Sequence, residues 1–123
     1  MLTARSPQEA YRQVDFDARV AGADPHTLVA LCFERFDAAL GSALFAHARA
    51  DNALRSRSLT QALAALTALQ IGVDRGAPLA AALDQLYRAA RVSLLDSVPA
   101  FDPVALAAIR SDFADIARAL ATG

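Results

Sequence analysis

Short breaks that contain Asp, Pro or Gly divide most of this chain into long segments rich in Ala and Leu. The 123 residues include 31 Ala and 17 Leu but only 7 Val and 3 Ile. Ala and Leu favour helices, whereas β-branched residues favour strands. The segments therefore predict an all-α protein.

The breaks carry signals that start and stop helices. Asp24-Pro25 and Asp102-Pro103 each place a capping carboxylate before a Pro at the first helical position. Asp51-Asn52 offers another cap, and Arg-Gly-Ala-Pro at 75–78 combines a stop with a restart. We expect four helices, over residues 25–50, 52–74, 78–98 and 103–122, with a shorter helix or arm within residues 7–20.

Each expected helix carries one stripe of apolar residues at helical spacing. Helices that each bury one stripe and are joined by short loops predict an antiparallel up-down four-helix bundle. Residues 24–123 would form this single domain, and residues 1–23 the N-terminal arm or short helix. The stripes are Leu28, Val29, Cys32, Phe33, Phe36, Ala39, Leu40, Ala43 and Leu44; Leu59, Ala62, Leu63, Leu66, Leu69 and Val73; Leu79, Leu83, Leu86, Tyr87, Ala90 and Leu94; and Leu106, Ile109, Phe113, Ile116 and Leu120.

Charge and composition argue against several functions. The 12 basic residues are all Arg, are balanced by 13 acidic residues and form no cluster, so we expect no nucleic-acid partner. A single Cys excludes an intrachain disulfide and a Cys-rich zinc site. The sequence has no apolar run of signal-peptide or membrane-span length, so we expect a cytosolic protein that does not insert into a membrane.

Patterns typical of catalysis are missing as well. His26 and His47 are about six turns apart on one expected helix and cannot share a metal ion. The segment around His47, LFAHARAD, lacks the Lys and the small Gly of a phosphotransfer module. The chain has no Glu-x-x-His pair and no Gly-rich phosphate loop. We expect no enzymatic activity, no cofactor and no metal site.

The chain has more apolar helical surface than four core stripes require. Such strips can form grooves that receive the apolar face of a helix from another protein. Two alternatives stay open for each strip: the N-terminal segment folds back over it, or the chain self-associates through it. The strips are Leu31, Ala38 and Phe45 on the first helix; Thr60, Ala64, Thr67 and Ile71 on the second; and Val92 and Leu95, close to Arg88, on the third.

Four runs of sequence resemble a known family, the flagellar secretion chaperone FliS. They are AYRQV at 10–14, ADPHTLVALCFERFDAAL at 23–40, ALAALTALQIGVD at 62–74 and LAAALDQLYRAARVSLL at 79–95. Their order and spacing carry the resemblance over about residues 10–120. The chain departs from the family at four positions. Ala82 stands where the family often has Asn, Ala89 where it commonly has a second aromatic residue, and Val98 where it has Asn. Leu120 or its neighbour stands where it usually has Trp.

The resemblance implies a cytosolic export chaperone. It would bind the disordered C-terminal segment of flagellin, prevent premature polymerisation and deliver flagellin to the flagellar type III export gate. The implied partners are this flagellin segment and an export-gate protein, and the chaperone itself would be a monomer or weak homodimer. The alternative is a self-associating structural bundle without a secretion client.

Seven residues are candidates for contacts with the client or the export gate. The resemblance implies that the segment around Tyr11 occupies part of the client groove or contacts the gate. Tyr87 matches a family Tyr, but it also lies on a core stripe, so a purely structural role is equally open. The remaining candidates come from the apolar strips. The seven are Tyr11, Leu31, Phe45, Ile71, Tyr87, Val92 and Leu95.

Overall fold

The computed structural model describes residues 16–19, 21–22 and 24–122. No strand occurs within these ranges, which agrees with the predicted all-α fold class. Residues 16–19 form a short helical segment. Four long helices follow: α2 (Pro25–Ala48), α3 (Asn52–Ile71), α4 (Ala80–Asp96) and α5 (Pro103–Thr122).

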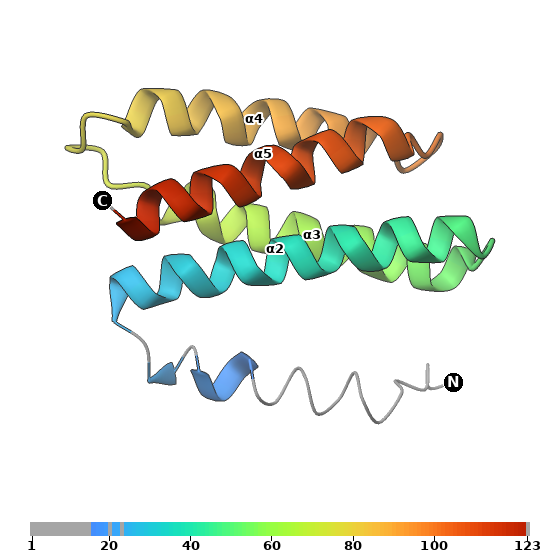
Figure 1. The fold of residues 1–123 in the computed structure, drawn as a ribbon, viewed down its shortest axis with the longest axis horizontal. Helices are drawn as coiled ribbons and strands as arrows, with labels where there is room; N and C mark the ends of the chain where they lie inside the picture. The colour runs from blue at the N-terminus through green and yellow to red at the C-terminus, as the bar shows by residue number, and fades with distance from the viewer. Residues whose placement is uncertain (1–15, 20, 23, 123) are drawn as a thin grey trace.

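The four long helices run alternately in opposite directions and form a bundle (Figure 1). Helix α2 packs most closely against α3 and less closely against α5, while α4 contacts α3 and α5. Helices α2 and α4 therefore face each other across the core. In this arrangement α2 has one neighbour on each side, and each of its two flanks meets a different helix.

Aspartate side chains cap the N-termini of three of the helices, as the sequence predicts. The carboxylate of Asp24 accepts a hydrogen bond from the backbone N–H three residues later at 2.7 Å. Asp51 and Asp102 accept the equivalent bonds at 3.0 Å. These bonds satisfy N–H groups that have no partner within the first helical turn. The backbone bond from Thr27 also lowers the pKa of Asp24.

Helix α4 begins later than the sequence predicts. Leu79 caps its N-terminus with no side-chain hydrogen bond, and α4 starts at Ala80 rather than Pro78. Leu79 is 57% exposed, so its predicted place on the core stripe is wrong. Helical periodicity positions a side chain only inside the helix, and Leu79 precedes it. Helices α2, α3 and α4 also end two or three residues before their predicted limits.

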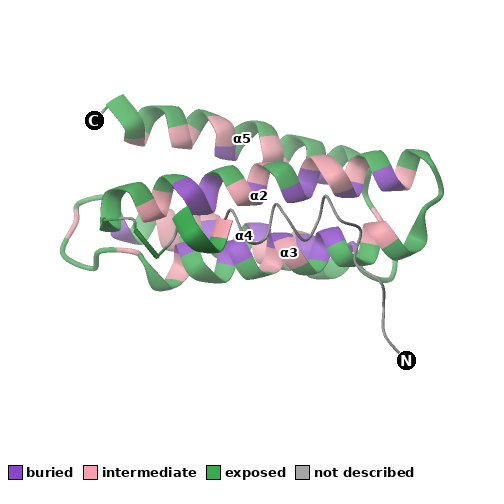
Figure 2. Ribbon diagram, turned by 90° about the horizontal axis from the view of Figure 1, so that it is seen from below, coloured by how far each residue is buried: buried purple, intermediate pink, exposed green. Residues whose placement is uncertain are grey.

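The core lies between the predicted stripes, on the sides of the helices that face one another (Figure 2). Four aromatic rings form its centre: Phe33, Phe36, Tyr87 and Phe113. The ring centroids of Phe36 and Phe113 lie 4.5 Å apart, and those of Phe33 and Tyr87 lie 6.5 Å apart. Tilted aromatic pairs at these separations add attraction to the burial of their surface.

The contact between α2 and α5 includes an arginine that lies against the backbone of α2. Nε and Nη2 of Arg110 donate hydrogen bonds to the carboxylate of Asp37 at 2.9 and 3.2 Å. These bonds raise the pKa of Arg110. A Cβ atom at Gly41 would lie 2.8–3.0 Å from the guanidinium atoms, closer than real Cβ contacts. Glycine at position 41 therefore lets this arginine approach the helix.

Candidate partner-binding surface

Within the described ranges, no group of three or more His, Cys, Asp or Glu side chains could hold a metal ion. Within the same ranges, none of the helices has both the length and the hydrophobicity that a membrane-spanning helix needs. Cys32 is buried, and desolvation raises the pKa of its thiol, which disfavours the reactive thiolate. The surface features that stand out are two grooves along α2 and a set of exposed apolar side chains on α2, α3 and α4.

His47 packs at the end of the bundle where α2 meets α3. Its ring stacks on Phe101 with centroids 4.4 Å apart, and its Nδ1 lies 3.3 Å from Nη1 of Arg55. The guanidinium of Arg55 lies 5.5 Å from the Phe101 ring centroid. The three side chains therefore tie both helices to the loop before α5, which gives His47 a structural role.

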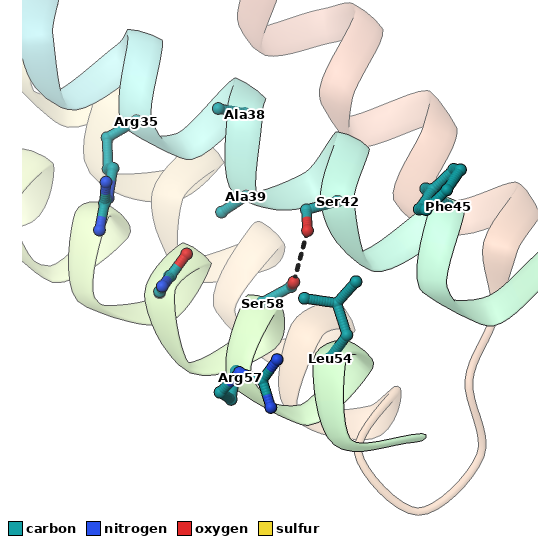
Figure 3. Close-up of a pocket in the computed structure, with 9 residues that line it drawn as sticks. Arg35, Ala38, Ala39, Ser42, Phe45, Leu54, Arg57 and Ser58 are labelled. Carbon is teal, nitrogen blue, oxygen red and sulfur yellow. Dashed lines mark hydrogen bonds between the residues drawn. The ribbon is translucent and has the colours of Figure 1, made fainter. Parts of the chain in front are cut away.

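The first groove lies between α2 and α3 and has a volume of about 320 Å³ (Figure 3). Each helix contributes residues three or four apart, which is the spacing of one helical face. The hydroxyl of Ser58 donates a hydrogen bond to that of Ser42 at 2.8 Å and joins the two walls. The lining residues are Arg35, Ala38, Ala39, Ser42 and Phe45 of α2 and Leu54, Arg57, Ser58 and Gln61 of α3.

This groove combines an apolar end with positive charge. Phe45 is 57% exposed, and the guanidinium of Arg49 lies 5.4 Å from its ring centroid. Phe45 and Leu54 lie toward one end, and Arg35 lies toward the other (Figure 3). Arg57 comes from the opposite helix to Arg35, so guanidinium groups are present on both walls.

The second groove lies on the other flank of α2, between α2 and α5, and has a volume of about 570 Å³. It reaches down to the core rings of Phe33 and Phe113, and small residues of α5 widen it. Glu34 and Asp37 contribute its carboxylates. The lining residues are His26, Val29, Ala30, Phe33, Glu34 and Asp37 of α2 and Phe113, Ala114, Ala117, Leu120 and Ala121 of α5. The two grooves thus share α2 as a wall but differ in the type of charged side chain that lines them.

A third apolar surface lies where α3 meets α4, around Arg91. Nε and Nη2 of Arg91 donate to the side-chain oxygen of Gln70 at 2.9 and 2.6 Å, and Nη2 donates to the hydroxyl of Thr67 at 2.5 Å. Large apolar side chains on the same helices, close in sequence to this contact, remain exposed to solvent. They are Ile71 at 79%, Val92 at 59% and Leu95 at 49%.

Four large apolar residues of the predicted strips are exposed, but Leu31 is not. It is 4% exposed, so its predicted place on an open strip is wrong. Its neighbours on α2 explain the difference: Glu34 pairs with Arg19 at 3.0 Å, and the guanidinium of Arg35 lies 5.0 Å from the Phe16 ring centroid. Residues 16–19 therefore lie against α2 one turn beyond Leu31, which agrees with the alternative in which the N-terminal segment folds back over this strip. Tyr11 lies outside the described residues.

Tyr87 belongs to the core rather than to a binding surface. It is 2% exposed, and the Phe113 ring centroid lies 5.8 Å from its own. Burial raises the pKa of its hydroxyl to about 12. Of the two interpretations left open for this residue, direct contact with a partner is wrong for the folded bundle, because its side chain has almost no accessible surface.

The α3 wall of the first groove was not predicted from the sequence. The predicted α3 strip, Thr60 to Ile71, lies on the side toward α4, whereas the groove is lined by the flank toward α2. The sequence did contain a signal for this wall: the four residues that form it have the spacing of one helical face. They are Leu54, Arg57, Ser58 and Gln61. The second groove was missed because its deepest residues were assigned to the core alone.

Comparison with known proteins agrees with the resemblance seen in the sequence. The model of a family described as Flagellar protein FliS matches residues 7–121. No match was found among curated proteins. The family consists of flagellar export chaperones rather than enzymes, and the matched range contains both grooves and the exposed residues of α3 and α4. Because this match spans nearly the whole chain, the protein belongs to the FliS family of flagellar proteins.

Proposed function

We propose that this protein is a chaperone of the bacterial cytosol that binds the disordered C-terminal segment of flagellin. It keeps this segment from polymerising prematurely and delivers it to the flagellar type III export gate. The observation that carries the proposal is Phe45, a large aromatic side chain that the core does not use and that stands exposed at the edge of a groove. Membership of a family of export chaperones supports the same conclusion.

A disordered client needs an extended contact rather than one pocket. Ordering each backbone residue costs about 1–2 kcal/mol, and apolar burial returns about 25 cal/mol per Å². Each ordered residue therefore has to bury roughly 40–80 Å² of apolar surface to offset its loss of entropy. A groove of 320 or 570 Å³ holds only a few side chains, so a client gains most by contacting several surfaces.

The surfaces on this bundle suit a client that folds into helices as it binds. Small residues such as Ala38 and Ala39 in one groove and Ala114 and Ala117 in the other leave room for the side chains of an approaching helix. The two grooves flank α2, and Ile71, Val92 and Leu95 add apolar contacts around α3 and α4. A client that wraps the bundle can reach these surfaces in turn.

The direct test mixes the protein with a peptide of the flagellin C-terminal segment. We expect a one-to-one complex on size-exclusion chromatography and a helix content, by circular dichroism, above the sum of the separate components. The gain reflects folding of the client on binding. A spectrum equal to that sum, together with no complex on the column, would rule out flagellin as the client.

Substitutions locate the contact. Phe45→Asp and Ile71→Asp should each weaken peptide binding by about tenfold or more, because each places a carboxylate in an apolar contact. Val104→Asp is the matched control, because Val104 is 79% exposed and lines neither groove. The thermal unfolding of all three variants should resemble that of the parent protein. Equal weakening by Val104→Asp would show that the effect is not local.

Self-association through the same surfaces is the alternative outcome. Light scattering at micromolar concentration distinguishes the two functions. A monomer or weak dimer that binds the peptide supports the chaperone function, whereas a tight dimer with no affinity for the peptide supports a structural bundle. Phe45→Asp should dissociate such a dimer if the α2–α3 groove forms its interface.

A further inference from the structure

The outward face of α4 is exposed and apolar at its centre. Tyr87 and Leu94 lie on the buried side of this helix, and Val92 lies nearly opposite them at 3.6 residues per turn. Val92 is 59% exposed, and Leu95, three residues later, is 49% exposed. Helix α4 lies on the opposite side of the bundle from residues 16–19, so this segment does not reach the face (Figure 1).

Two opposite charges flank Val92 at equal distances along α4. Arg88 lies four residues before it and Asp96 four residues after it, which is about 6 Å along the helix axis in each direction. Both side chains are exposed, and no hydrogen bond or ion pair within the described ranges involves either of them. Asp84, the acidic residue one turn before Arg88, pairs with Arg75 instead.

The position of Asp96 favours a cation from outside the helix. Asp96 is the last residue of α4, and the last turn of this helix contains no basic residue. A carboxylate there lies close to the negative end of the helix dipole, which disfavours it. A guanidinium group supplied by another molecule would offset both negative charges.

From this arrangement we propose that α4 is the contact surface for a second copy of the chain, with the two α4 helices packed antiparallel. A two-fold axis at Val92 places Arg88 of each copy beside Asp96 of the other, because the two charges are equally far from the axis. These three residues lie on one i, i+4 ridge, and such ridges interdigitate in the commonest class of helix pairs. A parallel pair in the same register would bring like charges together.

The dimer is weak and is a form of the free protein. Stable interfaces bury about 800 Å² on each partner from about 20–30 residues, and this face presents far fewer. Both grooves along α2 stay open in the dimer, since α2 lies across the core from α4. Val92 and Leu95 are also exposed to a client, so a client that reaches them displaces the second copy.

Sedimentation equilibrium of the full chain, without a client, tests the dimer. We expect the average mass to rise from 12.9 kDa at low micromolar concentration toward twice this value at hundreds of micromolar. Val92→Asp should keep the protein monomeric, because it places two carboxylates at the two-fold axis. Val104→Asp is the matched control, since it changes an exposed Val of α5 and should leave the dimer intact. A monomer at every concentration, or equal loss of the dimer in both variants, would overturn the proposal.

Charge reversal tests the antiparallel pairing. Arg88→Asp and Asp96→Arg each replace attraction by repulsion at both ends of the interface and should weaken self-association by about tenfold. A mixture of these two variants should associate, because each charged pair between them joins opposite charges. The double variant should recover the affinity of the parent protein, and circular dichroism checks that each variant is folded. A dimer that none of these changes affects would overturn the pairing.

The dimer and the proposed chaperone function can fail separately. If the flagellin peptide does not bind but the charge variants behave as expected, the flagellin assignment fails and the dimer stands. If the parent protein stays monomeric and Val92→Asp weakens binding of the peptide, this face belongs to the client. The dimer proposal then fails and the chaperone function stands.

Discussion

Ala50 has a backbone conformation that favours glycine. Its φ is 56°, in the left-handed region, and it is the only non-glycine residue with a positive φ in the described part of the chain. The conformation ends α2, since the N–H of Ala50 bonds to the carbonyl of His47 at 3.1 Å and that of Asp51 bonds to the carbonyl of Ala46 at 2.9 Å. Glycine is common at this point of a helix end because it has no Cβ to crowd the backbone.

Ala50→Gly should therefore raise the free energy of unfolding by about 1 kcal/mol, since it relieves the left-handed alanine. Ala64→Gly, at an exposed site within α3, is the control and should lower the free energy by about 1 kcal/mol. Urea denaturation measures both. If Ala50→Gly is as destabilising as Ala64→Gly, the left-handed conformation at position 50 is not present in solution.

The buried hydroxyl of Tyr87 makes stability depend on alkaline pH. Burial raises its pKa from 10 to about 12 because it disfavours the charged phenolate. Above about pH 10 the unfolded chain releases this proton before the folded protein does, so the free energy of unfolding should fall between about pH 10 and about pH 12. Urea denaturation across this range should show a smaller fall for Tyr87→Phe. The same fall in both proteins would assign the effect to other groups.

At the level of the helices, Phe113 is the residue that fastens α5 to the rest of the bundle. Its ring contacts Phe33 and Phe36 of α2 and Tyr87 of α4, with centroids 6.1, 4.5 and 5.8 Å away. Few other residues of α5 are fully buried. Phe113 is therefore the largest buried side chain of α5, beside Leu106 and the half-buried Ile109, Ile116 and Leu120 that pack against the same core.

Phe113→Ala should lower the free energy of unfolding by about 3–5 kcal/mol, the usual range for a buried Phe, because it leaves a cavity between three rings. Val104→Ala, at an exposed site of the same helix, should change it by less than about 0.5 kcal/mol. Chemical denaturation of both variants tests the contrast. Similar small losses would mean that α5 is held by contacts other than this ring.

The elements also show what the sequence could and could not predict. Helical periodicity identified the buried side of each helix, since Phe36, Leu66, Leu94 and Leu106 are fully buried as expected. It could not say which neighbour covers each flank, because that depends on how the helices are ordered around the core. For this reason the α3 wall of the first groove was missed. The burial of Leu31 was not predicted either, because the periodicity of α2 does not show that residues 16–19 contact the next turn of this helix.

In the molecule as a whole, packing is uneven. Helices α2 and α3 bury most of the core residues and lie closest together, whereas α4 and α5 contact each other only loosely. Regions with fewer buried contacts open at lower free energy. The bundle should therefore open first on the side of α4 and α5, while α2 and α3 stay paired.

Native-state hydrogen exchange tests this expectation. Amides in the middle of α2 and α3 should exchange only on global unfolding, and those in the middle of α4 should exchange through a partial opening of lower free energy. A bound client that contacts the α2–α5 groove should slow exchange in α5. Uniform protection across the four helices would show that the bundle opens only as one unit.

The interlock of Gly41 and Arg110 has a consequence for the register of the bundle. If α2 slid along α5 by one turn, about 5.4 Å, a side chain such as that of Ala38 or Leu44 would replace the glycine under the guanidinium. The arginine would then lose its place against the helix and its alignment with Asp37. The missing side chain at position 41 thus favours one axial position of α2 against α5, and with it the alignment of the helices along which a wrapping polypeptide would lie.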